Sequence, residues 1–148
     1  TAQTAREFGV VPRVAFISYS NFGTARGPGI AEVEEALRIL AKEEPDLVVD
    51  GPVHADTAVV PGLLSSLFPF SKLAGGTANV LIFTVLEAAN AAYKLVQRLG
   101  GAEQIGPILQ GMAKPVHVLQ PQSEMDDILN MTAIAVVEAG MLEEAKGR

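Results

Sequence analysis

The sequence predicts an α/β fold in which an open, mainly parallel sheet carries helices on its faces. Short apolar runs, each followed by a polar or glycine-containing loop and a segment of helical periodicity, recur along the 148 residues. A chain of this length can form one ordinary domain with a sizeable core. With 49% hydrophobic and 19% charged residues, the composition is typical of a globular protein and not of a disordered one.

The first part of the chain predicts one strand between two helices. Residues 1–8 have the pattern of the last turns of a helix, and Gly9 follows as a C-terminal cap. The apolar run at 13–19 predicts a buried parallel strand that ends in the polar loop 20–29. Residues 30–42 are expected to form a helix because apolar residues recur on one face, namely Ile30, Val33, Leu37 and Leu40.

The middle of the chain repeats this alternation twice. Residues 47–51 predict a second strand, and residues 55–67 predict a helix or a pair of short helices interrupted at Pro61. A glycine-rich turn then precedes a third apolar strand at 79–83, and a helix follows at 87–99. Strands that alternate with helices favour a sheet that binds ligands beyond the carboxyl ends of its strands.

The last part of the chain predicts a possible fourth strand at 115–119 and a long helix at 123–146. Ser123 and Asp126 have the spacing of a capping box, although Asp replaces the usual Glu or Gln. We therefore expect three segments: the end of a preceding helix at 1–9, an α/β lobe at 10–119 and a C-terminal helix at 120–148. The apolar character of that helix predicts a partner surface, such as another copy of the chain.

Composition and charge exclude several classes of partner. A net charge of −6 without a cluster of Lys and Arg argues against nucleic acid, because binding to a phosphate backbone requires many basic side chains. The chain has no Cys and two His, too few for a metal site without carboxylate help. The sequence has no signal-peptide pattern and no run of about 20 apolar residues that could form a membrane helix. The expected location is therefore the cytoplasm.

Four blocks of sequence together resemble one family, the phosphate acetyl/butyryltransferases. In chain order they are Asp50-Gly51 with Ala55-Asp56, residues 78–83, residues 90–95 with 98–101, and residues 105–111 with Lys114-Pro115. The resemblance extends from about Phe8 to Gly140. It implies a three-layer lobe like those of isocitrate and isopropylmalate dehydrogenases, and a final helix that returns to a first lobe missing from this chain.

The sequence departs from active members of that family at the catalytic positions. Those members continue from the Lys-Pro pair into a Ser-Arg pair, and an Asp follows six residues after the Arg. Here Gln120 and Pro121 replace the pair, and only Asp127 matches. Because proline has no guanidinium with which to bind phosphate or a developing oxyanion, the resemblance implies no catalytic residue, only a vestigial Asp127. The plainer interpretation of Asp127 is a carboxylate favoured by the helix dipole.

A narrower resemblance joins residues 114–119, Asn130-Met131 and residues 135–139 to the tail of bacterial NADP-dependent malic enzymes. In that family, N-terminal domains absent from this chain convert malate to pyruvate with NADP and a divalent metal, Mg or Mn. The tail is associated with homo-oligomers and with regulation by acetyl-CoA. The resemblance thus implies a cytoplasmic, catalytically silent acetyl-CoA-binding region of such an enzyme.

Two other functions remain open at this point. One is an active phosphate acetyl/butyryltransferase with rearranged groups, which needs another arginine to bind acetyl phosphate. The chain offers six: Arg6, Arg13, Arg26, Arg38, Arg98 and Arg148. The other is a purely structural dimerisation lobe that binds no nucleotide.

We expect the acetyl-CoA contacts among residues that follow or precede the strands and on one helix: Ser20, Asn21, Gly76, Thr77, Asn79, Lys94, Arg98 and His117. The glycines of the turn at 75–79 could let its backbone N–H groups bind a phosphate. The alternative is that the turn only connects two elements of the fold. Lys94 and Arg98, one helical turn apart, suit either phosphate contacts or a solvated face. His117, between two valines, suits either the cleft or a hydrogen-bonded structural role.

Overall fold

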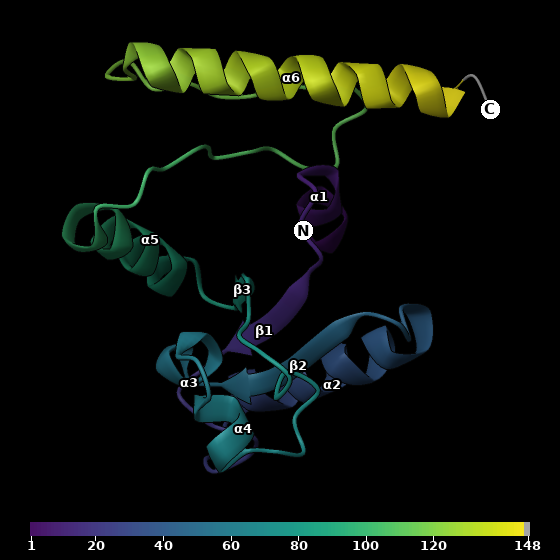
Figure 1. Cartoon of the computed structure of the whole chain (residues 1–148), viewed down its shortest axis with the longest axis vertical. Coiled ribbons are helices and arrows are strands. Elements are labelled where there is room, and N and C mark those ends of the chain that lie inside the picture. The colour runs from purple at the N-terminus through teal and green to yellow at the C-terminus, as the bar shows by residue number, and fades with distance from the viewer. Residues whose placement is uncertain (147–148) are drawn as a thin grey trace. The chain divides into compact units, whose positions relative to one another are not determined.

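The structure is a computed structural model that describes residues 1–146, and the backbone of this part contains six helices and three strands (Figure 1). The chain divides into two compact units, Thr1–Tyr93 and Lys94–Arg148, and each is described by itself. The predicted division at 1–9, 10–119 and 120–148 stays a prediction, and residues 147 and 148 lie outside the described part. No helix within residues 1–146 has the apolar length needed to span a bilayer.

The first unit is built on a parallel sheet with the strand order β2-β1-β3. Its strands are β1 (Arg13–Ile17), β2 (Val48–Val53) and β3 (Val80–Phe83). Val14 in the central strand pairs with Val49 on one side and with Val80 on the other. This sheet confirms the predicted fold class, and the three strands lie where the apolar runs indicated.

Four helices accompany the sheet: α1 (Ala2–Glu7), α2 (Pro28–Glu43), α3 (Ala55–Val59) and α4 (Leu63–Leu67). The split between α3 and α4 confirms the predicted interruption at Pro61, since proline lacks the N–H that a continuous helix requires. Gly62 starts α4 in the left-handed conformation, with φ of 80°.

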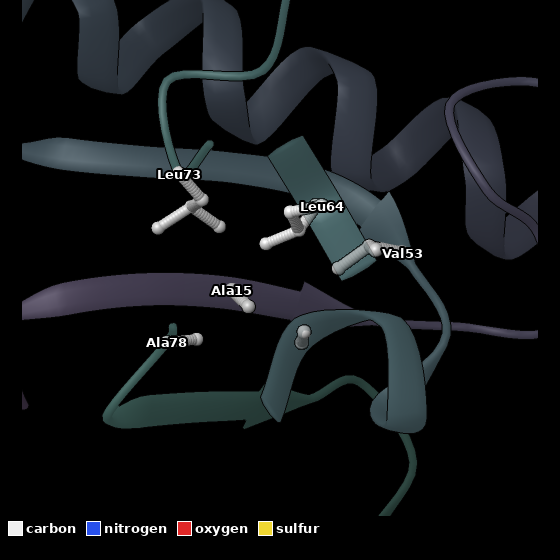
Figure 2. Close-up of a cluster of buried hydrophobic side chains, with 6 residues drawn as sticks. Ala15, Val53, Leu64, Leu73 and Ala78 are labelled. Atoms are coloured by element: carbon white, nitrogen blue, oxygen red, sulfur yellow. The ribbon is translucent and has the colours of Figure 1, made fainter. Parts of the chain in front are cut away.

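The two faces of the sheet bury separate clusters because neighbouring strand residues point to opposite sides. Figure 2 shows the first cluster, in which Val53, Leu64, Leu73 and Ala78 gather around Ala15 of β1. The second cluster contains Val14, Leu47, Val49 and Val80, against which Leu37 and Leu40 of α2 pack. Helices therefore cover both faces, and the arrangement has three layers.

The second unit contains a long apolar helix and the segment that precedes it. The helix α5 (Leu86–Gly100) crosses the boundary between the units, and α6 (Met125–Lys146) ends the described part. Between them, residues 101–121 have neither helix nor strand, and we call this segment the strap. Met131 and Ile134 are buried on α6, and no other hydrophobic residue of the second unit, as far as its burial is described, is buried.

The prediction of a fourth strand at 115–119 is wrong. This part of the strap pairs with none of the three described strands, and Val116 and Val118 are exposed. The inward-facing residue is His117, whose side chain is 6% exposed and bonds to Glu138 of α6. The alternation of exposed valines with a buried histidine thus arises from a segment that contacts α6 through a polar side chain.

Candidate functional site

The loop after β1 is held firmly at the carboxyl edge of the sheet. Ser20 is fully buried, and its Oγ accepts the N–H of Ala25 at 3.0 Å. Asn21 Oδ1 accepts the N–H of His54 at 2.8 Å, just after β2. The N–H of Phe22 donates to the carbonyl of Pro52 at 2.7 Å. These bonds join the ends of two neighbouring strands and fix the entry into α2.

A hollow of about 420 Å³ lies beside this loop at the start of α2. Its lining residues are Gly23, Arg26, Gly27, Ile30, Ala31 and Glu34. Arg26 has no hydrogen bond or ion pair with any other described residue, whereas Arg6 pairs with Glu44 and Arg38 with Glu35. A guanidinium that is not engaged within the described chain is a ready partner for a phosphate or carboxylate.

Arg26 and Glu34 were not among the predicted contacts. The signal available in the sequence was a single arginine between Gly23 and Gly27 in a loop that follows a buried strand. That signal is weak, because the sequence alone does not show which of several arginines lacks an internal partner.

The turn at 75–79 has a structural role at the amino edge of the sheet. The N–H groups of Gly76, Ala78 and Asn79 donate to the carbonyls of Leu73, Ala58 and Arg13. The guanidinium of Arg13 donates to the carbonyls of Leu73 and Thr77 at 2.7 and 2.9 Å. The interpretation of this segment as a plain turn therefore fits, because the donors of three of its five residues are used within the fold.

Asn79 also joins this turn to the start of β1. Its Oδ1 accepts the N–H of Arg13 at 2.7 Å, and its Nδ2 donates to the carbonyl of Val11 at 2.9 Å. Both ends of the amide are thus engaged with the backbone at the start of β1 and just before it. This role keeps β1 and β3 in register at their first residues.

The expected contacts in the first unit lie at opposite edges of the sheet. Ser20 and Asn21 follow β1, whereas Gly76, Thr77 and Asn79 precede β3, which is parallel to β1. One small site at a single edge cannot include both groups. Which of these residues contact acetyl-CoA stays a prediction, and the carboxyl edge is the one at which such sheets usually bind ligands.

The other three expected contacts belong to the second unit. Lys94 and Arg98 are exposed on α5. His117 Nε2 lies 2.9 Å from Oε2 of Glu138, and the buried Nδ1 has no hydrogen-bond partner in the described part. This contact favours the structural interpretation of His117.

Gln120 and Pro121 form an exposed turn before α6. The N–H of Gln120 donates to Oγ of Ser123 at 3.0 Å, and the Gln122 amide donates to that of Gln120. No arginine stands at this turn, and Pro121 has no N–H to offer an anion. Gln120 and Pro121 thus supply no positively charged group for a phosphoryl or acyl intermediate.

Asp127 caps α6, and the expected capping box of Ser123 and Asp126 is wrong. Asp127 Oδ2 accepts the N–H of Glu124 at 2.9 Å, because the helix starts at Met125 and places Asp127 at its third position. The carboxylate satisfies a donor that the helix leaves unpaired. The plainer interpretation of Asp127 therefore fits the structure.

Replacing Asp127 with alanine is expected to lower the free energy of unfolding by about 1 kcal/mol, the usual size of a lost cap. Asp126→Ala removes the same charge from the same turn and is expected to cost about half as much, since only the dipole contribution is lost. Urea unfolding followed by circular dichroism measures both. Equal losses in the two variants would show that the bond to Glu124 contributes nothing.

Metal-binding side chains do not gather anywhere in the described part. Within it, no group of three or more His, Cys, Asp or Glu side chains comes close enough to hold an ion. The carboxyl-edge hollow has Glu34 alone among these residue types. Its one cationic lining residue, Arg26, suits an anion.

Comparison with known proteins finds one family and two kinds of relative. The family described as phosphate acetyl/butaryl transferase matches residues 1–136. The NADP-dependent malic enzyme of Escherichia coli is 43% identical over 93% of this chain and 18% of its own length. The phosphate acetyltransferase of Corynebacterium glutamicum is 44% identical over 95% of this chain and 42% of its own length.

Solved structures give the same result. The EutD phosphotransacetylase from Staphylococcus aureus matches with a TM-score of 0.84 at 39% identity, over 93% of this chain and 43% of its own. A phosphotransacetylase from Streptococcus pyogenes matches with the same TM-score at 38% identity, over 97% of this chain and 43% of its own. The chain thus spans less than half the length of these relatives.

Proposed function

Because the chain belongs to the phosphate acetyl/butaryl transferase family, we propose that it is the regulatory and oligomerisation region of an NADP-dependent malic enzyme. In this proposal the region binds acetyl-CoA and catalyses no acyl transfer. NADP and the divalent metal belong to the malic-enzyme domains, which are not part of this chain.

The observation that carries the proposal is the turn at Gln120 and Pro121. Active members of the family have Ser and Arg there, and here Gln120 and Pro121 offer neither a hydroxyl nor a guanidinium at those two positions. Asp127, which matches the third position, is occupied with the N–H of Glu124. Without the arginine, the turn has no cationic side chain to stabilise the charge that develops during transfer to a thiol, which supports the proposal of a silent region.

Sequence identity alone does not separate the two kinds of relative. Malic enzymes of Escherichia coli and Salmonella typhimurium are 43% and 41% identical, and the phosphate acetyltransferase of Corynebacterium glutamicum is 44% identical. The choice rests instead on residues 114–119 with Asn130-Met131, where the sequence resembles the malic-enzyme tail, and on the loss of the Ser-Arg pair.

The hollow at the carboxyl edge suits the phosphates of acetyl-CoA. Arg26 supplies a planar fork of donors that matches two phosphate oxygens. Glu34 also lines the hollow and repels anions. We therefore expect the anion to bind at the guanidinium of Arg26 and not throughout the hollow. Ser20 is too buried to contact a ligand while its hydroxyl stays bonded to Ala25.

Arg26→Gln is expected to raise the dissociation constant for acetyl-CoA at least tenfold, because a charge-assisted hydrogen bond contributes about 1.5–3 kcal/mol. Arg38→Gln is the matched control, since Arg38 is paired with Glu35 on the same helix. Titration calorimetry of the chain with acetyl-CoA measures both. Equal affinity for all three proteins would remove Arg26 from the site, and no binding to any of them would favour a purely structural lobe.

A second candidate function is an active phosphate acetyltransferase with Arg26 in place of the missing arginine. The unengaged guanidinium of Arg26 is the observation that favours it. A thiol-release assay with acetyl phosphate and CoA separates the two functions. Turnover that disappears in Arg26→Gln would support this candidate and contradict the proposal that the region catalyses no acyl transfer.

The regulatory role is tested on the intact parent enzyme. Malate-dependent NADPH formation is measured with and without acetyl-CoA, beside a version truncated before this region. The expected result is a rate that responds to acetyl-CoA only when the region is present, because a ligand shifts an equilibrium through its differential affinity for two states. If neither version responds, a structural tail is the better interpretation.

A further inference from the structure

The hollow at the carboxyl edge has opposite charges at its two ends. Its lining follows one face of α2, because residues at spacings of three and four recur in it, namely Gly27, Ile30, Ala31 and Glu34. Arg26 lies just before the helix, and Glu34 lies about 9 Å along the helix from its first residue. Between the two charges the lining is apolar, since Ile30 is buried and Ala31 has only a methyl group.

The carboxylate of Glu34 is available to a ligand because the nearest cation on α2 pairs with another residue. Arg38 follows Glu34 by four residues and Glu35 by three, and both spacings favour an ion pair on a helix. Arg38 pairs with Glu35. Glu34 lines the hollow instead, and it has no hydrogen bond or ion pair with any other described residue.

The Arg26 end of the hollow has a second hydrogen-bond donor, Tyr19. A Cβ added to Gly27 would collide with the hydroxyl of Tyr19, so this hydroxyl lies directly against the residue that follows Arg26. Tyr19 is exposed, and its hydroxyl, like the guanidinium of Arg26, has no hydrogen-bond partner among the described residues. A guanidinium and a phenolic hydroxyl at this end can donate to the same carboxylate.

Charge indicates which class of ligand suits the whole hollow. A simple anion is attracted by Arg26 but repelled by Glu34 and by the net charge of −6. A simple cation is attracted by Glu34 but repelled by Arg26. A zwitterion with well-separated charges satisfies both side chains, and its net charge of zero removes the repulsion from the chain as a whole. A zwitterion with both charges on one carbon is too short to bridge them.

We propose that the hollow binds a zwitterion whose carboxylate and ammonium stand at the two ends of a short apolar chain, as in an ω-amino acid. The carboxylate accepts hydrogen bonds from Arg26 and Tyr19, and the ammonium donates to Glu34. The apolar chain lies on Ile30 and Ala31. Because this ligand and acetyl-CoA both need Arg26, they compete. The zwitterion site goes beyond the proposed function, and only the competition rests on it.

Titration calorimetry of the chain with 6-aminohexanoate tests the site, beside hexanoate, hexylamine and glycine. Hexanoate and hexylamine each lack one of the two charges, and glycine has both charges but lacks the length. Each of these three compounds is expected to bind at least tenfold more weakly than 6-aminohexanoate, because each loses one charge-assisted contact. Hexanoate or glycine binding as tightly as 6-aminohexanoate would contradict the inference.

Glu34→Gln is expected to raise the dissociation constant for 6-aminohexanoate at least tenfold and to lower that for acetyl-CoA, because the carboxylate binds the first ligand and repels the second. Glu32→Gln is the matched control. It removes the same charge from the same helix, but Glu32 does not line the hollow, so both affinities are expected to stay unchanged. Equal affinity of 6-aminohexanoate for the parent chain and Glu34→Gln would overturn the inference.

The zwitterion site and the proposed function give different results in these titrations. If acetyl-CoA binds through Arg26 and 6-aminohexanoate does not bind, the zwitterion site is wrong and the proposed function stands. If 6-aminohexanoate binds through Arg26 and Glu34 and acetyl-CoA does not bind, the zwitterion site stands and the acetyl-CoA proposal is wrong. If both bind and neither changes the affinity of the other, the competition at Arg26 is wrong.

Discussion

Replacing Gly51 with alanine is expected to lower the free energy of unfolding by about 4 kcal/mol, from backbone strain and overpacking together. Gly51 is buried in β2 and has φ of 149°, which residues with a side chain rarely adopt. A Cβ at this position would lie 2.9 Å from both Cβ and the carbonyl oxygen of Phe16 in the adjacent strand. The contact involves backbone, so a simple side-chain rotation cannot relieve it.

Substitutions at two other glycines separate the contributions of backbone strain and overpacking to the loss of stability expected for Gly51→Ala. Gly62 also has a positive φ, 80°, but nothing lies within 4 Å of an added Cβ, so Gly62→Ala measures the strain alone, about 1–2 kcal/mol. Gly29 has neither constraint and lies in α2, so Gly29→Ala is expected to be neutral or slightly stabilising. Urea unfolding of the three variants gives the values. Equal losses at Gly51 and Gly62 would show that Phe16 gives way without cost.

Asp50→Ala is expected to lower the free energy of unfolding by about 3 kcal/mol, since it leaves three donors, two of them on the buried residues Gly51 and Ser71, without an acceptor. Asp50 Oδ1 accepts the N–H of Gly51 at 2.9 Å. Its Oδ2 accepts the hydroxyl of Ser71 at 2.8 Å and the N–H of Lys72 at 2.9 Å. One carboxylate thus fastens β2 to the segment that leads toward β3.

Asp50→Asn is the control for shape, and about half of the loss is expected to remain, because an amide accepts through one atom only. Ser71→Ala removes a single partner and is expected to cost about 1 kcal/mol. A double-mutant cycle between Asp50 and Ser71 isolates their bond. A coupling energy near zero would mean that the carboxylate is bonded to water in solution.

The elements of the sheet were predictable because their signals are local. The apolar runs that include Val14, Val49 and Val80 became the three strands, and Pro61 separated α3 from α4 as its chemistry requires. A strand that is buried on both faces has apolar residues at nearly every position, so a continuous apolar run in the sequence indicates where such a strand lies. The apolar stripe of α2 likewise faces the second cluster through Leu37 and Leu40.

The errors concern contacts between segments distant in sequence. Val116 and Val118 look like strand residues, but a strand also needs a neighbour with free backbone groups, and this segment pairs with none of the described strands. The sequence also does not show that Arg13 is engaged by carbonyls while Arg26 is not. The bonds of Arg13 reach carbonyls 60 and 64 residues away in the sequence, and Arg26 differs by the absence of a described partner.

The sequence indicated individual polar residues as candidates for the site, but it did not indicate which of them lie close together. Asn21 and Asn79 are both polar residues next to apolar strands, and nothing in either pattern indicates the edge of the sheet to which each belongs. Parallel strands resolve this, because loops before and after strands fall at opposite edges. Topology places Asn21 at the carboxyl edge, and the hydrogen bonds of Asn79 to Arg13 and Val11 assign Asn79 to strand registration.

Gln120 and Pro121 lie in an exposed turn outside both buried clusters. Substitutions at such positions change stability by about 0.5 kcal/mol or less. A lineage can therefore exchange a serine and an arginine here, or regain them, without passing through an unfolded intermediate. The fold therefore sets little limit on the residues at this turn, and the chemistry of the turn can change over evolutionary time while the scaffold stays the same.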